Sequence, residues 1–322
     1  MVNARIYRSG NNIFDCKRTD NGQMIQAIAK GQLLKGDEGP VVGDFVELNF
    51  DEQTSQFEVM KIMKRKNGLY RYTPRENRKK ITAANIDILV IQSSVSKPVF
   101  KRGFIDRFLV RAIEWQVRPI IVFNKMDEYS EKDFDLSFEA QRVEALGVEC
   151  FEIAAKFPEY KNKYLKNGLS ELQKILKNET AIFLGQSGVG KSKVINCLSE
   201  NEFDVRVNKV GKYGKGNHTT TWSEIYDYGD YTLVDSPGIR SLSLEDHDPK
   251  ELMSYFPDLC DKAALCQFNN CDHLKNNKRC AFQEDRLSDS LESRLTLSRL
   301  EGFLRIYGEL LETPLWKKRF KS

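Results

Sequence analysis

The sequence has no long apolar run and nothing typical of a secreted or membrane protein. No stretch approaches the roughly 18 consecutive apolar residues that a membrane-spanning helix needs. The first residues, MVNARIYRSG, lack the apolar core and small-residue cleavage site of a secretory signal peptide. We therefore expect a cytoplasmic protein with no membrane segment.

Cysteine is present, but its number and context argue against a disulfide framework. The chain has seven cysteines, an odd number, and no secretion signal. Internal repeats and low-complexity tracts are missing as well. Three cysteines are scattered and four lie in one short region: Cys16, Cys150 and Cys197, then Cys260, Cys266, Cys271 and Cys280.

The composition fits a soluble globular protein of two or three domains, with 322 residues of which 40% are hydrophobic and 30% charged. The net charge of +4 is small, but residues 61–80 hold nine Lys or Arg against one acid, Glu76. Interleaved aromatic residues make this stretch, and the terminal WKKRFKS, suited to a nucleic-acid backbone and its bases. A solvated charged surface explains the same pattern equally well.

Hydrophobic patterning divides the chain into three parts. Short alternating runs with turn residues, such as DFVELNF, predict a small β-barrel of the oligonucleotide-binding (OB) type over residues 1–72. Continuous apolar runs such as IDILVIQSS (86–94) then alternate with helical patterns, which predicts a parallel sheet with helices on both faces over 73–245. A loop-rich cysteine region and an amphipathic helix at 290–312 form a third domain, 246–322. We expect a multidomain α/β protein.

A phosphate-binding loop is predicted at GQSGVGKS, which fits G-x-x-x-x-G-K-[ST] between an apolar strand and a helix. Lys191 is expected to bridge the terminal phosphates and Ser192 to bind Mg²⁺. Backbone N–H groups of the loop should surround the phosphate oxygens. The loop residues are Gly185, Gln186, Ser187, Gly188, Val189 and Gly190.

Two further segments indicate a hydrolysable terminal phosphate. In DSPG, Asp235 is placed to hold Mg²⁺ through water, and Gly238 can offer its N–H to the phosphate. The Gly-rich segment 211–221 ends in three threonines, of which Thr220 is our choice for closing onto Mg²⁺. Alternatively, the threonine run only begins the next strand.

The motif NKMD indicates that the base is guanine. Asp127 can accept hydrogen bonds from both guanine donors, whereas adenine would leave its carboxylate unpaired. Asn124 can bond neighbouring base and loop groups, and the stem of Lys125 can lie along the base. A second base loop is predicted at Ala154, Ala155 and Lys156, where the Ala155 N–H would face the guanine oxygen.

The base motifs precede the phosphate loop in the chain, which indicates a circular permutation. Such a rearrangement costs little when the original termini lie close together on the surface. It also places DSPG near the end of the sheet domain. The following domain can then be coupled directly to movement of this segment.

The cysteine region has metal-ligand spacing. Cys266-x4-Cys271-x-His273-x6-Cys280 supplies three thiolates and one imidazole, enough for a closed tetrahedral zinc site. Such a site would stabilise a segment that is too loop-rich to fold by itself. Cys260 is interpreted as a spare buried thiol.

Together these motifs resemble the ribosome small-subunit-dependent GTPase A (RsgA) family. The resemblance rests on VVGDFVEL, AANIDILVI, IDRFLV, NKMD, GQSGVGKS, HTTT, DSPGIR and the cysteine cluster. It implies an OB-type barrel, a circularly permuted P-loop GTPase domain and a zinc-binding helical domain. It also implies GTP hydrolysis to GDP, with Mg²⁺ and Zn²⁺ bound, stimulated by the small ribosomal subunit during late maturation. We expect a monomer that contacts rRNA and ribosomal proteins.

The catalytic group is the least determined part of this prediction. Ras-like GTPases carry a water-orienting glutamine directly after DxxG, but Ile239 stands there. His218, beside the threonine run, is the best candidate, although it can equally be a loop residue that contacts RNA. Slow intrinsic turnover is therefore expected.

A non-enzymatic rRNA-binding scaffold with a regulatory nucleotide site is the alternative function. Ile239 and the basic stretch at 61–80 favour it, whereas the intact Lys191, Ser192 and Asp235 favour the hydrolase. A permuted GTPase that acts on the large subunit is a weaker rival, because the barrel and the cysteine cluster argue against it.

Overall fold

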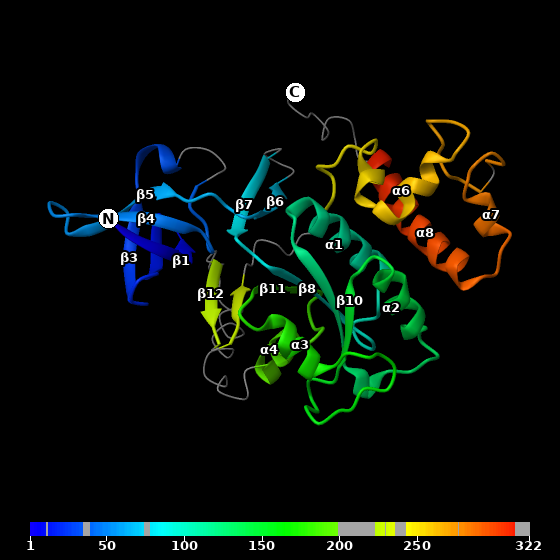
Figure 1. Cartoon of the computed structure of the whole chain (residues 1–322), viewed down its shortest axis with the longest axis horizontal. Helices are drawn as coiled ribbons and strands as arrows, with labels where there is room; N and C mark the ends of the chain where they lie inside the picture. The colour runs from blue at the N-terminus through cyan, green and yellow to red at the C-terminus, as the bar shows by residue number, and fades with distance from the viewer. Residues whose placement is uncertain are drawn as a thin grey trace.

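The computed structural model describes residues 1–10, 12–34, 39–73, 78–198, 223–228, 230–235, 243–275 and 277–312. Three parts follow one another along the chain: a small β-barrel, an α/β sheet domain in the centre and a helical part at the far end (Figure 1). The expected barrel, α/β core and helical C-terminal part are thus confirmed. Among the described residues, no helix is both long enough and apolar enough to span a bilayer.

The N-terminal part is a closed barrel of five strands. Closure occurs where β1 pairs with β4, because the order β1-β2-β3-β5-β4 then returns to its start. Inward-facing apolar side chains such as Ile6, Phe14 and Leu48 fill its interior. The elements are β1 (Val2–Gly10), β2 (Ile13–Arg18), β3 (Met24–Ala29), the 3₁₀ turn η1 (Gly31–Leu34), β4 (Phe45–Asp51) and β5 (Gln56–Ile62).

Strand β1 belongs to two sheets at once. Its first half pairs with β4 inside the barrel, and its last residues pair with β12 (Ser223–Asp227) of the central sheet, Arg8 opposite Glu224. Tyr7 and Lys17 add side-chain contacts to Asp227, with Oη–Oδ2 at 2.9 Å and Nζ–Oδ2 at 2.6 Å. The barrel is therefore attached to the strand that begins directly after residues 199–222.

The barrel is followed by a β-hairpin, which the sequence analysis does not predict. Strands β6 (Gly68–Thr73) and β7 (Arg78–Ala84) form an antiparallel two-stranded sheet, and Ala83 of β7 also makes an isolated bridge to Val42. Their alternation of basic and aromatic residues indicated a charged surface rather than strands. The hairpin lies on both sides of the expected boundary at residues 72 and 73, and this boundary remains a prediction.

The central sheet has the order β10-β9-β8-β11-β13-β12. All neighbours are parallel except β12 and β13, which are antiparallel. Strand β8 is buried at every residue, as its continuous apolar run predicts. The strands are β8 (Ile88–Ser94), β9 (Arg118–Asn124), β10 (Glu149–Ile153), β11 (Thr180–Gly185) and β13 (Thr232–Asp235).

Helices cover both faces of this sheet. Alternate residues of β8 face opposite sides, so that Leu89 and Ile91 pack with α1 and α2, whereas Ile88 and Val90 pack with α3 and α4. Each face therefore has its own apolar core. The helices are α1 (Arg102–Trp115), α2 (Leu136–Glu144), α3 (Leu169–Leu176) and α4 (Lys191–Leu198), with the 3₁₀ turn η2 (Met126–Glu128) between β9 and α2.

The C-terminal part packs on α1 and α2 through buried charge. Asp106 of α1 accepts hydrogen bonds from Arg142 of α2 at 2.8 Å and from Arg299 at 2.6 Å, and Arg299 also pairs with Asp258. The absence of a side chain at Gly302 permits this approach, because a Cβ there would lie 2.5 Å from Asp106 Oδ2. The elements are the 3₁₀ turn η4 (Leu252–Tyr255), α6 (Pro257–Ala264), α7 (Gln283–Arg286) and α8 (Leu291–Glu312).

Candidate functional site

The predicted motifs gather at one edge of the central sheet. Parallel strands end at the same edge, and ligands of such sheets bind beyond the carboxyl ends of the strands. Strand β9 ends at Asn124, β10 at Ile153, β11 at Gly185 and β13 at Asp235. The base motifs and the phosphate loop thus meet in space, despite their reversed order in the chain.

The phosphate loop needs glycine at two positions for steric reasons. A Cβ on Gly185 would lie 2.4 Å from the backbone oxygen of Gln92, and one on Gly190 would lie 2.5 Å from Asn124 Nδ2. Gly188 and Gly190 also have φ values of +83° and +90°, which disfavour other residues. The loop is consequently pressed against β8 and the base motif.

Lys191 begins α4 and its ammonium group lies within the loop. Its Nζ donates to the carbonyl oxygens of Gly185 at 2.7 Å and Gln186 at 2.9 Å. The positive charge is thereby held where an anion entering the loop would meet it. Ser192, the predicted Mg²⁺ ligand, occupies the next position in the helix.

Asn124 joins the two halves of the site. It is 2% exposed, its Nδ2 donates to the carbonyl of Val189 at 2.9 Å, and its Oδ1 accepts the N–H of Ala155 at 3.1 Å. One side chain thus connects the base motif, the phosphate loop and the second base loop. Cys197 of α4 adds a further link, because its thiol donates to the Ala155 carbonyl at 3.0 Å.

The second base loop differs in one contact from the expectation. The Ala155 N–H was assigned to the guanine oxygen, but in the structure it donates to Asn124. This N–H can reach the base only by sharing or exchanging that bond. Ala154 and Ala155 are buried, and Lys156 is exposed.

The other base residues lie at the mouth of the site. Asp127 is exposed on η2, so its carboxylate is accessible to a ligand. Lys125 has left-handed backbone geometry with φ of +69°, and its Nζ donates to the carbonyl of Lys97. The loop that follows β8 is therefore tied to the base motif.

Glu152 is a site residue that sequence reasoning missed. This fully buried carboxylate accepts the backbone N–H groups of Lys163, Tyr164 (3.0 Å) and Leu165 (2.7 Å). It thereby organises the segment that follows the second base loop. An acid within the otherwise apolar strand CFEIAA was the available indication.

Several predicted residues cannot be placed. His218, Thr220 and Gly238 lie outside the described residues. Asp235 ends β13, but its side chain is not described. Their roles remain predictions.

The four predicted metal ligands are brought together. Their ligand atoms all lie within 4.8 Å of one another. Cys266 Sγ is 3.5 Å from His273 Nδ1 and 4.0 Å from Cys280 Sγ, and Cys280 Sγ is 3.7 Å from the same nitrogen. Tetrahedral Zn²⁺ with bonds of about 2.0–2.3 Å would separate its ligands by about 3.4–3.8 Å, so the cluster fits that ion.

The surroundings of this cluster also suit a cation. Burial and the adjacent thiols of Cys266 and Cys280 raise the pKa of the Cys271 thiol to about 12. A bound divalent cation would reverse this, because it stabilises the thiolate. The Ala281 N–H and the Asn277 amide lie at 3.3 and 3.4 Å from Cys266 Sγ and Cys271 Sγ and can support the thiolates. None of the seven cysteines forms a disulfide, in agreement with the sequence analysis.

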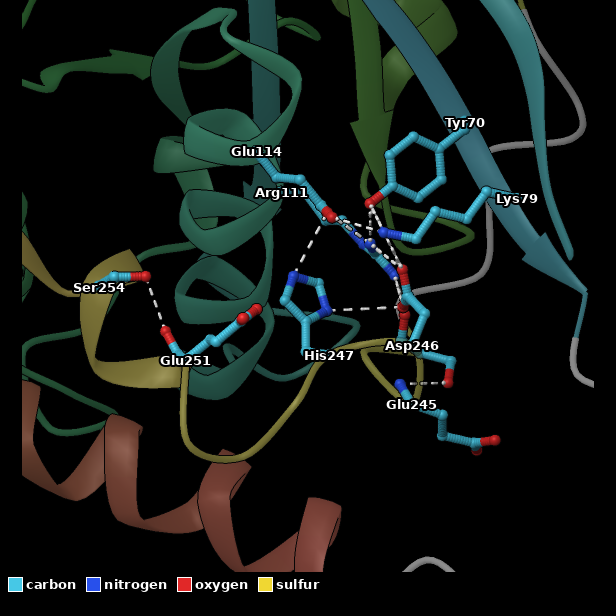
Figure 2. A network of polar contacts seen from close by, with 10 residues as sticks. Tyr70, Lys79, Arg111, Glu114, Glu245, Asp246, His247, Glu251 and Ser254 are labelled. Carbon is cyan, nitrogen blue, oxygen red and sulfur yellow. Dashed lines mark hydrogen bonds and ion pairs between the residues drawn. The ribbon is translucent and has the colours of Figure 1, made fainter. Parts of the chain in front are cut away.

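A polar junction connects the segment after DSPG to the rest of the molecule (Figure 2). Arg111 of α1 binds both carboxylate oxygens of Asp246, at 2.6 and 3.0 Å. Lys79 of β7 lies 3.2 Å from the same carboxylate, and its Nζ donates to Tyr70 at 2.8 Å. We call Tyr70, Lys79, Arg111, Glu114, Asp246 and His247 the junction cluster. It joins the β6–β7 hairpin, α1 and residues 243–247.

The electrostatics of the junction cluster favour ion pairs over a metal. Glu114, Asp246 and His247 have metal-ligand chemistry and lie close together, but Arg111 and Lys79 already neutralise the two carboxylates. Burial alone would raise the pKa of Asp246, yet His247 and Arg111 lower it well below its usual range. Burial would lower the pKa of His247, yet Asp246 and Glu114 raise it.

The basic stretch at 61–80 also forms ion pairs within the chain, largely buried for Arg65 and exposed for Lys66 and Lys79. Arg65 pairs with the buried Asp44 at 2.7 Å, Lys66 with Asp87 at 2.7 Å, and Lys79 with the junction cluster. Neither of the two initial interpretations of this stretch anticipated these ion pairs. Lys64, Arg71 and Lys80 are exposed and can face a polyanion.

Comparison with known proteins identifies the family. The family model described as RsgA GTPase matches residues 62–245, which is more than half of the chain. The chain belongs to the RsgA GTPase family. As an RsgA GTPase it is a GTP hydrolase, and its family implies GTP or GDP and Mg²⁺ as ligands.

Full-length relatives and solved structures agree with this assignment to RsgA. Proteins named small ribosomal subunit biogenesis GTPase RsgA from Bacteroides fragilis and Flavobacterium psychrophilum are 35% and 31% identical to the chain. The alignments cover 85% and 94% of the chain, and 88% and 91% of these relatives. The crystal structure of YjeQ from Thermotoga maritima matches with a TM-score of 0.73 and 25% identity, over 97% of this chain and 99% of that one.

The permuted order expected from the sequence is confirmed for this RsgA chain. The structure of YloQ, described as a circularly permuted GTPase, shares the fold with a TM-score of 0.68 at 24% identity, over 98% of this chain and 96% of YloQ. In both the sequence and the sheet described above, the base motif on β9 precedes the phosphate loop on β11.

The metal cluster makes a first prediction. Loss of a residue that only supports a metal ligand lowers metal affinity by about 10–100-fold. Cys271→Ser removes a ligand itself, so we expect a larger decrease in metal affinity. Bound metal per chain, measured by elemental analysis after dialysis against a chelator, should fall from one equivalent. Amide exchange in residues 257–286 should accelerate.

Cys260→Ser is the matched control. Its thiol donates to the Met253 carbonyl at 3.1 Å and is not one of the clustered ligands, so this variant should keep its metal. If Cys271→Ser retained both the metal and slow amide exchange, the cluster would not be a metal centre.

The junction cluster makes a second prediction. Asp246→Asn removes the carboxylate that binds Arg111 through both oxygens and leaves Glu114 as its remaining acidic partner, which should destabilise the fold by about 1.5–3 kcal/mol. Asp248→Asn, at an exposed neighbouring aspartate, should change stability little. Denaturant unfolding of both variants provides the comparison, and equal stabilities would contradict the role given to Asp246.

The raised pKa of His247 adds a pH dependence to this second prediction. Its imidazolium stabilises the junction fully below the ordinary histidine pKa, and the effect is lost as pH rises through the raised folded value. His247→Gln should thus lower the melting temperature more at about pH 6 than at about pH 9. A decrease that is the same at both pH values would show that protonation of His247 is irrelevant.

Proposed function

We propose that this GTPase acts on the small ribosomal subunit during its biogenesis, hydrolyses GTP to GDP and is stimulated by the subunit. The curated relatives carry that role in their names, and the alignment with them extends over the whole architecture. The observation that carries the nucleotide site is the hydrogen bond from Asn124 to Val189, across 65 positions of sequence. It brings the predicted guanine motif and the predicted phosphate loop into direct contact.

In this proposal the phosphate loop binds the triphosphate of GTP. N–H groups of residues 185–190 bind the phosphate oxygens, and Lys191, already directed into the loop, neutralises the terminal phosphates. Ser192, Thr220 and Asp235 would hold Mg²⁺, which supplies charge neutralisation at the transferred phosphate. Gly238 would offer its N–H to the same group.

The base loops select guanine. Asp127 is exposed at the edge of the site and accepts hydrogen bonds from both guanine donors. Asn124 holds the phosphate loop against the base motif through its hydrogen bond to Val189. Lys125 and the loop formed by Ala154, Ala155 and Lys156 complete the surroundings of the base. The Ala155 N–H would exchange its bond with Asn124 for one to the base.

His218 is our candidate for orienting the attacking water. Ile239 cannot take this role, because its side chain has no hydrogen-bonding group. If His218 orients the water, turnover depends on the partner that orders the segment to which His218 belongs. Stimulation by the small subunit would then act through the position of His218.

Contact with rRNA is assigned to the barrel and the hairpin. The exposed Lys64, Arg71 and Lys80 follow or belong to these elements and can neutralise phosphates. For the cysteine cluster we propose Zn²⁺, since three thiolates and one imidazole suit its tetrahedral geometry. The scaffold alternative is disfavoured by membership of a GTPase family.

Phosphate release tests this function as a third prediction. The wild-type chain should hydrolyse GTP slowly, purified small subunits should accelerate it, and ATP should be a poor substrate. Lys191→Ala should reduce stimulated turnover by roughly 100-fold or more, because the charge on the terminal phosphates is lost. A wild-type rate that small subunits leave unchanged would reject the proposal.

His218→Ala separates the catalytic group from subunit binding. We expect this variant to lose the stimulation while co-sedimentation with small subunits persists. Unchanged stimulated turnover would show that His218 has no catalytic role, and lost co-sedimentation would support the RNA-contact alternative instead.

Base selection provides a fourth prediction. Asp127→Asn replaces an acceptor with an amide that can donate to the O2 oxygen of xanthine, so the preference should shift from GTP toward XTP. The change should exceed about 100-fold in the ratio of the two affinities, since a mispaired polar group costs several kcal/mol. Asp133→Asn, at another exposed aspartate, is the control. An unchanged ratio would place the base elsewhere.

A further inference from the structure

The carbonyl of Val189 accepts two amide donors, and only one of them belongs to a recognised motif. Asn124 Nδ2 donates at 2.9 Å and Gln92 Nε2 donates at 3.1 Å. Gln92 lies near the carboxyl end of β8 and is fully buried. Its function is not explained by the motifs discussed above.

The orientation of the Gln92 amide is forced by this contact. A carbonyl oxygen can only accept, so the amide must present its nitrogen to Val189. Its other end, Oε1, then has no hydrogen-bond partner among the described residues. Leaving a buried acceptor unpaired is unfavourable, and an apolar side chain of the same size would avoid this. The contribution of the Gln92 amide is a donor to the Val189 carbonyl, which an apolar side chain could not supply.

The contribution follows from the geometry of the peptide bond. In a trans peptide the C=O and the N–H of one unit point in opposite directions. The Val189 carbonyl shares its unit with the N–H of Gly190, the last amide of the phosphate loop before Lys191. Holding the carbonyl toward the sheet therefore turns the Gly190 N–H away from the sheet, toward the phosphates.

The two donors hold this peptide from different places. Asn124 also accepts the Ala155 N–H and so belongs to the base site. Gln92 extends from the central sheet, where its own backbone carbonyl is the group that a Cβ on Gly185 would meet at 2.4 Å. Gln92 of β8 thus contacts the phosphate loop near both of its ends, at Gly185 and at Val189.

We propose that Gln92 is a positioning residue for the phosphate cradle, which keeps the Val189–Gly190 peptide turned so that its N–H faces the nucleotide phosphates. Its amide donates to the phosphate loop, whereas Asn124 makes the contact with the second base loop. This inference rests on the proposed nucleotide site and deepens it. Loss of the amide should weaken binding of phosphorylated guanine ligands and spare the binding of guanosine.

The test is the affinity of the full chain for GDP and guanosine, measured by competition against a fluorescent GDP analogue. Gln92→Met keeps the side-chain volume and removes the donor. We expect GDP to bind about tenfold more weakly and guanosine to change less than about twofold. Gln141→Met, the same change at an exposed position of α2, should behave as wild type. Unchanged GDP affinity, or equal losses for both ligands, would overturn the proposal.

Gln92→Glu supplies a second, independent arm in case the methionine variant folds poorly. When protonated, the carboxyl group can donate to the Val189 carbonyl, but when ionised it repels both that oxygen and the phosphates. GDP affinity relative to wild type should therefore fall as pH rises through the pKa of this buried acid. A constant ratio across pH would contradict the proposal. If wild type bound neither GDP nor guanosine, the nucleotide site itself would be wrong.

Discussion

The carbonyl of Val189 is the point on which the arrangement of the site depends. Asn124 from the guanine motif and Gln92 from the central strand both donate to it. This shared acceptor aligns the phosphate loop with the sheet and with the base motif at once. Chain order is irrelevant to such an arrangement, because the parallel strands bring their carboxyl ends to one edge whatever the connections. A permuted chain can therefore bring the same motifs together.

The two outer parts are attached next to the segments that carry His218, Thr220 and Gly238 in the sequence. The barrel reaches the sheet through β1 and β12, and β12 begins directly after residues 199–222, which include His218 and Thr220. The C-terminal part is reached through residues 243–247, directly after 236–242. There the Arg111–Asp246 pair is buried, with Glu114 as a second acidic partner of Arg111 and Lys79 as a second basic partner of Asp246.

Charge in this protein is used for internal cohesion as well as for partners. Arg65, Lys66 and Lys79 belong to the stretch that looked most like a nucleic-acid contact, yet each has an acidic partner within the chain. Between α1, α2 and α8, Asp106 likewise joins two arginines. Clustering of basic residues in the sequence therefore does not reveal which of them form ion pairs within the chain, and Lys66 and Lys79 remain exposed although they are paired.

The sequence by itself determined the fold class, the family and the motifs, because each is encoded locally: burial shows in the continuous apolar run of β8, and phosphate or metal chemistry in fixed spacings of a few residues. Only the tertiary structure decided the contacts between distant segments. Arg111 and Asp246 are 135 positions apart, the apolar residues of the β6–β7 hairpin lie among basic ones, and Gln92 is one of three consecutive polar residues at the end of β8. A hydrogen bond between distant side chains leaves no period or spacing in the sequence, so these partners become visible only when folding brings their elements together.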